Sequence, residues 1–211
     1  MSCDFYFVRH GQTYWNAQAI MQGQTNIPLN EVGKEQATNT REILKDVDFD
    51  IAFTSPLMRS SETAEIVLEG RDVELKIEPM VIEQAYGISE SLPHTGWYEE
   101  DSPIYGYRPY PEKFKANIGG ESFEALTDRA RRYVKERLIP MENQYNCVLV
   151  ASHGAFLSAL FNVFTGNDDI SQFWREMLPN AGAARVHLEN GVFTIEEVFN
   201  NGQENVPISE R

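Results

Sequence analysis

Near its start the chain has the sequence Phe5-Tyr6-Phe7-Val8-Arg9-His10-Gly11, and this stretch decides the fold. Four apolar residues are followed by a polar residue, a histidine and a glycine, a pattern typical of a buried parallel strand that ends in a loop. The same order recurs in Cys147-Val148-Leu149-Val150-Ala151-Ser152-His153-Gly154. Ligands of open α/β sheets bind beyond the carboxyl ends of the strands. We therefore expect His10 and His153 to face one crevice at the same end of a sheet.

The rest of the chain alternates between strand and helix patterns. Short apolar runs predict strands at residues 5–8, 51–54, 75–77 and 148–151. Apolar residues at helical spacing predict helices at residues 31–47, 56–67, 123–138 and 154–164. In the second of these helices, Ser55 is the expected N-cap and Pro56 the first helical residue. Asn190-Gly191, between residues 184–188 and 192–198, indicates a closing hairpin.

This alternation predicts an α/β fold, namely a three-layer α/β/α sandwich on a mostly parallel sheet. Residues 86–120 interrupt it, because they hold four prolines and five of the nine tyrosines without a sustained period. We expect them to form a lid of loops and short helices inserted over the crevice. Neither an internal repeat nor a linker is visible, so residues 1–211 are expected to form a single domain with a frayed tail at residues 200–211.

The charge balance limits the partners of the protein. Lys plus Arg number 18 and Asp plus Glu number 32, so the formal net charge is −14 at pH 7. Such a surface repels nucleic acids and anionic membranes, and an anion must therefore bind in a local basic pocket. Two cysteines, Cys3 and Cys147, make no disulfide framework, and the start of the chain lacks the features of a signal peptide. We expect a cytoplasmic enzyme, and the oligomeric state stays open, a homodimer included.

Several residues at expected element ends suit phosphoryl chemistry. A neutral imidazole such as that of His10 is a nucleophile toward phosphorus, and the adjacent Arg9 can clamp phosphoryl oxygens. Arg59 falls in the first turn of a helix, where a cation opposes the helix dipole unless an anion binds there. His153 and Gly154 add a second imidazole at a helix start, whose N–H groups suit phosphate. Strand-end histidines bound to carbonyls and an exposed arginine are the structural alternative, which the joint occurrence of these residues disfavours.

These motifs resemble those of the histidine phosphatase superfamily, also called phosphoglycerate mutase-like. The resemblance covers nearly the whole chain, and the motifs follow the family's order. They are Arg9-His10-Gly11-Gln12-Thr13, Asn16, Gln22-Gly23, Pro28-Leu29, Gly33, Gln36-Ala37, Ser55-Pro56-Leu57 with Arg59, Glu62-Thr63-Ala64, Gly120-Glu121-Ser122 and Ser152-His153-Gly154. Each tripeptide alone is a weak signal, but the ordered set is specific.

The resemblance implies that His10 becomes phosphorylated during turnover. It implies a substrate site as well, and the residues expected to bind the phosphoryl group or the substrate are Arg9, Asn16, Gln22, Gly23, Arg59, His153 and Gly154. A carboxylate general acid is also implied, and Glu83 matches its position. A partly buried carboxyl can hold the proton that a leaving alkoxide needs, although by residue type alone Glu83 is one of 32 acids. No spacing typical of metal ligands is present, so we expect a reaction without a metal.

The lid bears on the choice among three functions. Between residues 86 and 118 five acids, Glu90, Glu99, Glu100, Asp101 and Glu112, face three cations, Arg108, Lys113 and Lys115. This lid lacks the paired arginines of the mutase pattern, and its tyrosines and Trp97 favour an organic or apolar leaving group. We predict a cofactor-independent phosphatase acting on a small phosphomonoester. The alternatives are a phosphoglycerate mutase, which would require 2,3-bisphosphoglycerate, and a non-catalytic phospholigand-binding module, which the intact site set disfavours.

Cys3, His94 and His187 are assigned no catalytic role. Cys3 and Arg9 have the Cys-x5-Arg spacing of cysteine-dependent phosphatases, but the residues between them are expected to form a strand rather than a phosphate loop. His94 lies in the lid and His187 on a late strand.

Overall fold

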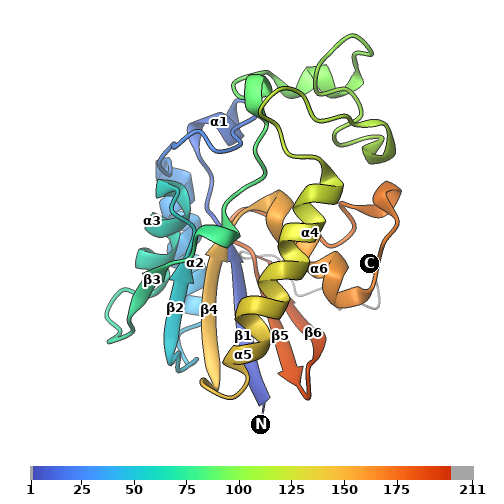
Figure 1. Ribbon diagram of the computed structural model, residues 1–211. Helices are drawn as coiled ribbons and strands as arrows, with labels where there is room; N and C mark the ends of the chain where they lie inside the picture. The colour runs from blue at the N-terminus through green and yellow to red at the C-terminus, as the bar shows by residue number, and fades with distance from the viewer. Residues whose placement is uncertain (1, 201–211) are drawn as a thin grey trace.

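The computed structural model describes residues 2–200 and contains a six-stranded sheet with the strand order β3-β2-β4-β1-β5-β6 (Figure 1). The strands are β1 (Ser2–Arg9), β2 (Ile51–Thr54), β3 (Leu75–Ile77), β4 (Cys147–Ser152), β5 (Ala183–Glu189) and β6 (Val192–Phe199). The first four strands pair in parallel, whereas β5 runs antiparallel to β1 and β6 antiparallel to β5. The predicted mostly parallel sheet and its closing hairpin are therefore confirmed.

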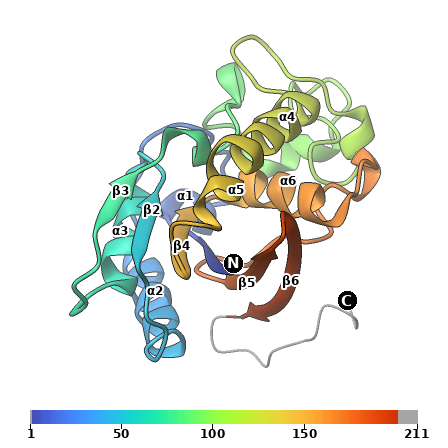
Figure 2. The ribbon, with the colours of Figure 1, turned by 60° about the horizontal axis from the view of Figure 1, so that its bottom comes forward.

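Helices cover both faces of the sheet, which gives the predicted three-layer sandwich (Figure 2). One face carries α2 (Glu31–Ile43) and α3 (Met58–Val67). The other carries α4 (Phe123–Tyr133), α5 (Ile139–Met141) and α6 (Gly154–Thr165). A π-helical turn, Val134–Leu138, joins α4 to α5, so the helix predicted at residues 123–138 is present with a local change of winding. The short α1 (Tyr14–Ala17) lies at the end of the sheet where the lid is (Figure 1).

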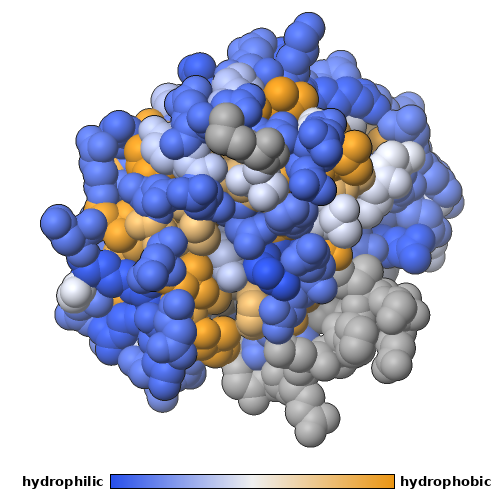
Figure 3. Space-filling view, turned by 90° about the horizontal axis from the view of Figure 1, so that it is seen from below, coloured by the Kyte–Doolittle hydropathy of each residue, from blue (hydrophilic) through white to orange (hydrophobic). Residues whose placement is uncertain are grey.

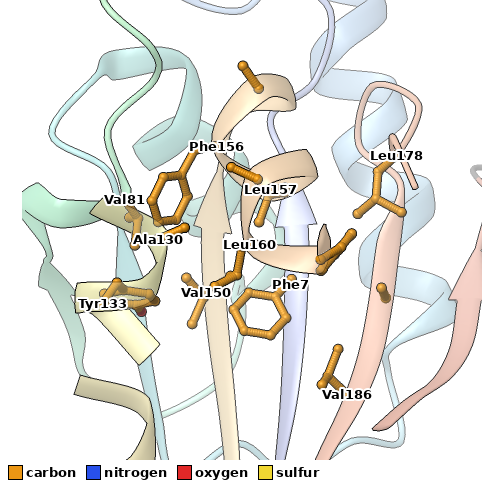
Figure 4. Packing of buried hydrophobic residues seen from close by; sticks show 14 of the residues in the cluster. Phe7, Val81, Ala130, Tyr133, Val150, Phe156, Leu157, Leu160, Leu178 and Val186 are labelled. Carbon is orange, nitrogen blue, oxygen red and sulfur yellow. The ribbon is translucent and has the colours of Figure 1, made fainter. Parts of the chain in front are cut away.

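The core between α6 and the sheet holds the two histidine-bearing strands in place. Leu157 and Leu160 of α6 lie toward Phe7 of β1 and Val150 of β4, whereas Phe156 packs against Tyr133 of α4, and all of these side chains are fully buried (Figure 4). Each large apolar side chain buried in this way contributes about 1.5–3 kcal/mol. Since α6 is apolar around most of its circumference, it needs both the sheet and α4 to cover it. The strand ends beneath the crevice are therefore a rigid platform.

The start of α3 differs from the prediction. Leu57 is the N-cap and Pro56 precedes the helix, so the expected roles of Ser55 and Pro56 were wrong. The Ser55 hydroxyl is instead 2.7 Å from His153 Nε2, and it accepts only a long hydrogen bond, 3.3 Å, from Leu57 N. The Ser55 hydroxyl thus contacts His153, far away in the sequence, instead of capping α3, and the local sequence pattern does not reveal this contact. Arg59 still lies in the first turn of the helix.

The lid, residues 86–120, contains three short 3-10 helices, Gly87–Ser89, His94–Tyr98 and Pro111–Lys113. It lies beyond the carboxyl ends of the parallel strands (Figure 1). A β-bridge between Tyr86 and Gly120 closes its base, and a second bridge between Ile20 and Pro93 ties it to the segment after α1. Of the predicted frayed tail, residues 201–211 lie outside the described residues.

The face opposite the lid is largely hydrophilic, with apolar residues scattered over it (Figure 3). Within residues 2–200, no helix combines the length and the apolar composition needed to cross a bilayer. Even α2, with 13 residues, is shorter than the roughly 20 residues that such a span requires.

Candidate active site

His10 and His153 follow neighbouring parallel strands. Arg9 and Ser152 are register partners in the β1–β4 pair, and His10 N donates to Ser152 O at 2.9 Å. The two imidazole rings lie 5.2 Å apart between centroids, at an interplanar angle of 57°. Both side chains are buried. The structure thus places the two histidines together at one end of the sheet, as their matching sequence contexts indicate.

The His10 ring is held in one tautomer. Its Nδ1 lies 2.7 Å from Gly11 O, and because a carbonyl oxygen only accepts, Nδ1 carries the hydrogen. Nε2 therefore keeps its lone pair. Burial, together with the charges of Arg59 and Arg9, lowers the pKa of His10 well below its usual value of 6.5. The imidazole is neutral at pH 7, which a nucleophile requires.

Arg59 is a fully buried cation next to His10. Its Nη1 donates to Thr25 O at 2.9 Å and its Nη2 to Gly23 O at 2.7 Å. Its Nε has no hydrogen-bond partner within the part of the chain that the structure describes. Burial lowers the pKa of Arg59 to about 10, so the group stays charged at pH 7. A buried charge with an unused donor is costly unless an anion binds beside it.

Arg9 lies against the first turn of α6. Its Nη1 donates to Leu178 O at 2.7 Å, and its Nε, like that of Arg59, is buried without a partner among residues 2–200. A Cβ on Gly154 would lie 3.3 Å from both Cζ and Nε of Arg9, so glycine at this position makes room for the guanidinium. Burial also lowers the pKa of Arg9.

Glu83 is a buried acid at the start of α6 rather than an ordinary surface acid. Its Oε1 accepts from Gln84 N at 2.9 Å and from Phe156 N at 3.2 Å, and its Oε2 accepts from Ala155 N at 3.3 Å. Two N–H groups of the first turn of α6 are therefore occupied, which corrects the expectation that this helix start is free for phosphate. The Glu83 charge acts on both Arg9 and Arg59 and opposes the fall in their pKa.

A cavity of about 310 Å³ adjoins these groups. The predicted site residues that line it are Arg9, His10, Asn16, Gln22, Gly23, Arg59, Glu83 and Gly154. His153 is fully buried and is not among the lining residues. Its Nε2 lies 2.7 Å from Ser55 Oγ, and its Nδ1 is without a partner in the described chain. A role for His153 in binding the phosphoryl group stays a prediction.

Asn16 and Gln22 are held by one threonine. Asn16 Oδ1 accepts from Thr13 N at 3.1 Å, and Gln22 Oε1 accepts from Thr13 Oγ1 at 2.9 Å. Because both side-chain oxygens are used in this way, the amide nitrogens are the groups that these residues can offer to a ligand. The positive φ of Gly23, 54°, allows the turn that presents its carbonyl to Arg59.

The rest of the cavity lining was predicted from the sequence only in part, as a lid with tyrosines and Trp97 over the crevice. Its residues come from the segment after α1, from the lid and from the loop after α6, and they are Ile20, Met21, Tyr86, His94, Trp97, Tyr107, Arg108, Trp174 and Met177. His94, which was assigned no catalytic role, lines the cavity and stacks on Trp97 at 4.0 Å. The aromatic content of the lid was the one signal in the sequence. No local pattern marks Trp174 or Met177.

The remaining candidates lie away from the cavity. Cys3 and Arg9 are at opposite ends of β1, and burial raises the pKa of the Cys3 thiol to about 12, so neither geometry nor charge suits a cysteine nucleophile. His187 on β5 bonds Asp4 at 2.6 Å. Among residues 2–200, no cluster of three or more His, Cys, Asp or Glu side chains is placed to hold a metal ion.

Comparison with known proteins places this geometry in context. The chain matches the family model of the histidine phosphatase superfamily (branch 1) over residues 5–201. It is 35% identical to PhoE of Bacillus subtilis, an uncharacterized phosphatase, over 90% of this chain and 91% of the relative. It is 32% identical to a 2,3-bisphosphoglycerate-dependent phosphoglycerate mutase of Gloeobacter violaceus, over 72% of this chain and 71% of the relative. The solved alpha-ribazole phosphatase from Shigella flexneri has a TM-score of 0.82 and 27% identity, covering 96% of this chain and 100% of that one.

Proposed function

The chain belongs to the histidine phosphatase superfamily (branch 1), and from this premise we propose that it hydrolyses small phosphomonoesters through a phosphohistidine on His10. The observation that carries the proposal is the state of His10. Its ring is neutral, its Nε2 has a free lone pair, and it lines a cavity together with the buried Arg59 and the half-buried Arg9. This arrangement favours attack on an anionic phosphoryl group over simple anion binding.

In the first step His10 Nε2 attacks phosphorus and the bond to the ester oxygen breaks. Arg9 and Arg59 balance the charge on the phosphoryl oxygens. The hydrogen of His10 stays on Nδ1, which donates it to the Gly11 carbonyl oxygen, and this bond orients the ring. Glu83 in its protonated form gives a proton to the departing ester oxygen, which leaves as an alcohol. General acid catalysis of this kind contributes typically about 10²- to 10⁴-fold.

In the second step water attacks the phosphorus of phosphohistidine. The Glu83 carboxylate takes one proton from that water, the N–P bond breaks, and inorganic phosphate leaves. His10 returns to its neutral form and Glu83 to its protonated form. The backbone N–H groups that hold Glu83 at the start of α6 keep its position the same in both steps.

Two other functions are alternatives to phosphomonoester hydrolysis, a mutase and a non-catalytic binding module. A mutase would return the phosphoryl group to another oxygen of a phosphoglycerate instead of to water, and a mutase is among the relatives of the chain. The lid contributes a single arginine to the cavity lining rather than a pair, which favours hydrolysis. A non-catalytic binding module would not need the neutral, oriented His10 ring.

The direct experiment is rapid-quench labelling with a phosphorus-labelled 4-nitrophenyl phosphate and an alkaline quench, which preserves phosphohistidine. Wild type and His187→Gln should give base-stable, acid-labile label on the protein and release inorganic phosphate. His10→Ala should give neither, and His187→Gln is the matched control because His187 lies outside the cavity lining.

Label that persists in His10→Ala would overturn the proposed nucleophile. Isomerisation of 3-phosphoglycerate that depends on 2,3-bisphosphoglycerate and outpaces hydrolysis would establish the mutase instead. Phosphomonoester binding without any turnover would establish the binding module.

A further inference from the structure

Arg108 is the charged side chain that the lid contributes to the cavity lining. Its guanidinium carbon lies 4.7 Å from the centroid of the Trp174 ring, and its Nη1 lies 2.8 Å from Met177 Sδ. No carboxylate of the described residues forms an ion pair with it, and the neighbouring Tyr86 and Tyr107 are uncharged at pH 7, since burial raises the pKa of each well above 10. Arg108 is therefore a half-buried cation that is held by apolar and aromatic surfaces alone.

The acids of the lid do not neutralise Arg108, because they lie elsewhere. Glu99, Glu100 and Asp101 line a separate hollow with Pro93 and Ser102. Glu90 is used by the segment that carries Gly23, since it accepts from Gln24 N and from the Thr25 hydroxyl. Glu112 is exposed and is not among the cavity residues. The net charge of the lid is negative, but the charge that it brings to the cavity is positive.

The surroundings of Arg108 leave its charge without compensation. Burial lowers the pKa of Arg108, and its charge in turn lowers the pKa of Arg9. A cation over an indole ring gains about 0.5–2 kcal/mol, but the ring supplies no counter-charge. Holding a guanidinium at this position is therefore favourable chiefly when an anion enters the cavity. The transferred phosphoryl group already has the charges of Arg9 and Arg59, which act on His10.

We propose, resting on the phosphatase function above, that Arg108 binds a second anionic group, a carboxylate or a phosphate, carried by the leaving group of the substrate. Met177 and the Trp174 ring orient the guanidinium toward the cavity. The aromatic wall formed by Trp97, Tyr107 and Trp174 then packs on the carbon skeleton between the two anions. The leaving group was expected to be organic or apolar; this proposal keeps the organic skeleton and replaces the apolar alternative with an anionic one, a small organic acid or a second phosphate ester.

Two matched substrate pairs test the proposal in wild type. The pair 3-phosphoglycerate and glycerol 3-phosphate differs by a carboxylate, and the pair propane-1,3-diol bisphosphate and 3-hydroxypropyl phosphate differs by a phosphate. Inorganic phosphate release should show a higher kcat/KM for the anionic member of at least one pair, by roughly 10- to 100-fold, as expected for a charge-assisted hydrogen bond. The pair with the larger ratio identifies the anion.

Arg108→Met should lower that ratio toward 1, and Arg108→Lys should keep part of it. Arg175→Met is the matched control, because Arg175 is exposed next to Trp174 and pairs with Glu176 outside the cavity. Thermal unfolding shows whether each variant is folded, and the lysine variant tests the proposal if the methionine variant is not.

A wild-type ratio near 1 for both pairs would overturn the proposal. An equal loss for both members in Arg108→Met would also overturn it, since Arg108 would then contact the transferred phosphoryl group. Failure of the phosphatase function itself would appear differently, as no phosphate release from any of the four substrates and no label on His10.

Discussion

The inner wall of the cavity comes from strand ends and helix starts, whereas its outer wall comes from the lid and the loop after α6. The inner wall holds Arg9, His10 and Arg59 through backbone carbonyls, with His10 and Arg59 buried almost completely and Arg9 half-buried. The outer wall is held by ring contacts and side-chain hydrogen bonds, as in the packing of Tyr107 against Trp174. We infer that the inner wall determines the chemistry of phosphoryl transfer and that the outer wall determines which substrate is accepted.

The two walls are connected through Arg129 of α4. Its Nη1 donates to Met80 O at 2.9 Å and to Ile82 O at 2.7 Å, next to Glu83. Its Nη2 pairs at 2.7 Å with Glu121, which directly follows the lid. A substitution of Arg129 should therefore lower activity less than a substitution in the inner wall and more than one in the outer wall.

The largest expected effect is on the inner wall. Arg59→Met removes a charge that stabilises the phosphoryl group, so kcat/KM for 4-nitrophenyl phosphate should fall roughly 10²- to 10³-fold. Arg71→Met is the matched control, because Arg71 also donates to two carbonyls, those of Leu44 and Val47, outside the cavity. Similar losses in both variants would contradict a special role for the inner wall.

The inner wall should also control how stability depends on pH. An unfolded histidine binds a proton near pH 6.5, whereas the pKa values of His10 and His153 are lowered well below this in the folded state. The free energy of unfolding should therefore fall as the pH drops below 6.5, by up to about 1.4 kcal/mol per pH unit for each residue. Burial also lowers the pKa of the half-buried His94, so His94 contributes to the same loss of stability at low pH. Urea unfolding at pH 7.5, 6.5 and 5.5 measures the slope.

His187 supplies the control for this slope, because its bond to Asp4 raises its pKa. Its stabilisation is fully present below pH 6.5 and is lost as the pH rises through its folded pKa. His187→Gln should therefore remove a gain in stability between pH 7.5 and 6.5 and preserve the fall below pH 6.5. Stability that does not change from pH 6.5 to 5.5 would show that the buried histidines can take up protons.

An intermediate effect is expected at the connection between the walls. Arg129→Met should displace the segment that carries Glu83 and lower kcat/KM for an alkyl phosphate about tenfold, a part of the contribution of general acid catalysis. The loss should be smaller for 4-nitrophenyl phosphate, whose leaving group needs no proton, and Arg129→Lys should recover part of it. Equal losses for both substrates would contradict a positioning role for Arg129.

The smallest effect is expected in the outer wall. Tyr107 Oη donates to Gln84 Oε1 at 2.9 Å and also bonds Tyr86 Oη. Tyr107→Phe removes these bonds and should cost about 1 kcal/mol, which is roughly 2–4 °C in Tm for a domain of this size. Tyr105→Phe is the control, because the Tyr105 ring packs on Tyr110 outside the cavity lining. Since Tyr107 and Tyr86 are buried in the main core, a larger shift would mean that leaving Gln84 Oε1 and Tyr86 Oη without a partner costs more than the loss of the two bonds.

The sequence predicted the inner wall well because its residues sit in local patterns. Each strand that carries a site residue is a short apolar run, and Arg9 and His10 come directly after one of them. The parallel arrangement puts His10 and His153 at the same edge of the sheet, and the pairing of β1 with β4 in the folded chain then brings them side by side. The start of α3 was wrong because the hydroxyl of Ser55 is used by a histidine 98 positions away.

The outer wall could be predicted only as an aromatic lid and not residue by residue, because its residues meet only in the folded chain. Arg108, Trp174 and Met177 belong to two segments without a periodic pattern. A count of charges in the lid gave a negative sum, yet its acids and its arginine face different sides. A sum of charges along the sequence does not show toward which side of the lid each charged side chain points.

The sequence by itself determined the strands of a mostly parallel sheet, the order of the motifs and the identity of the residues at the strand ends, because hydrophobic periodicity is a local property. Only the tertiary structure decided that Glu83 binds the start of α6, that His153 is held by Ser55, and that Arg108 lines the cavity. These contacts join residues far apart in the chain, and their energies depend on burial and direction, which exist only once the sheet and its helices have packed.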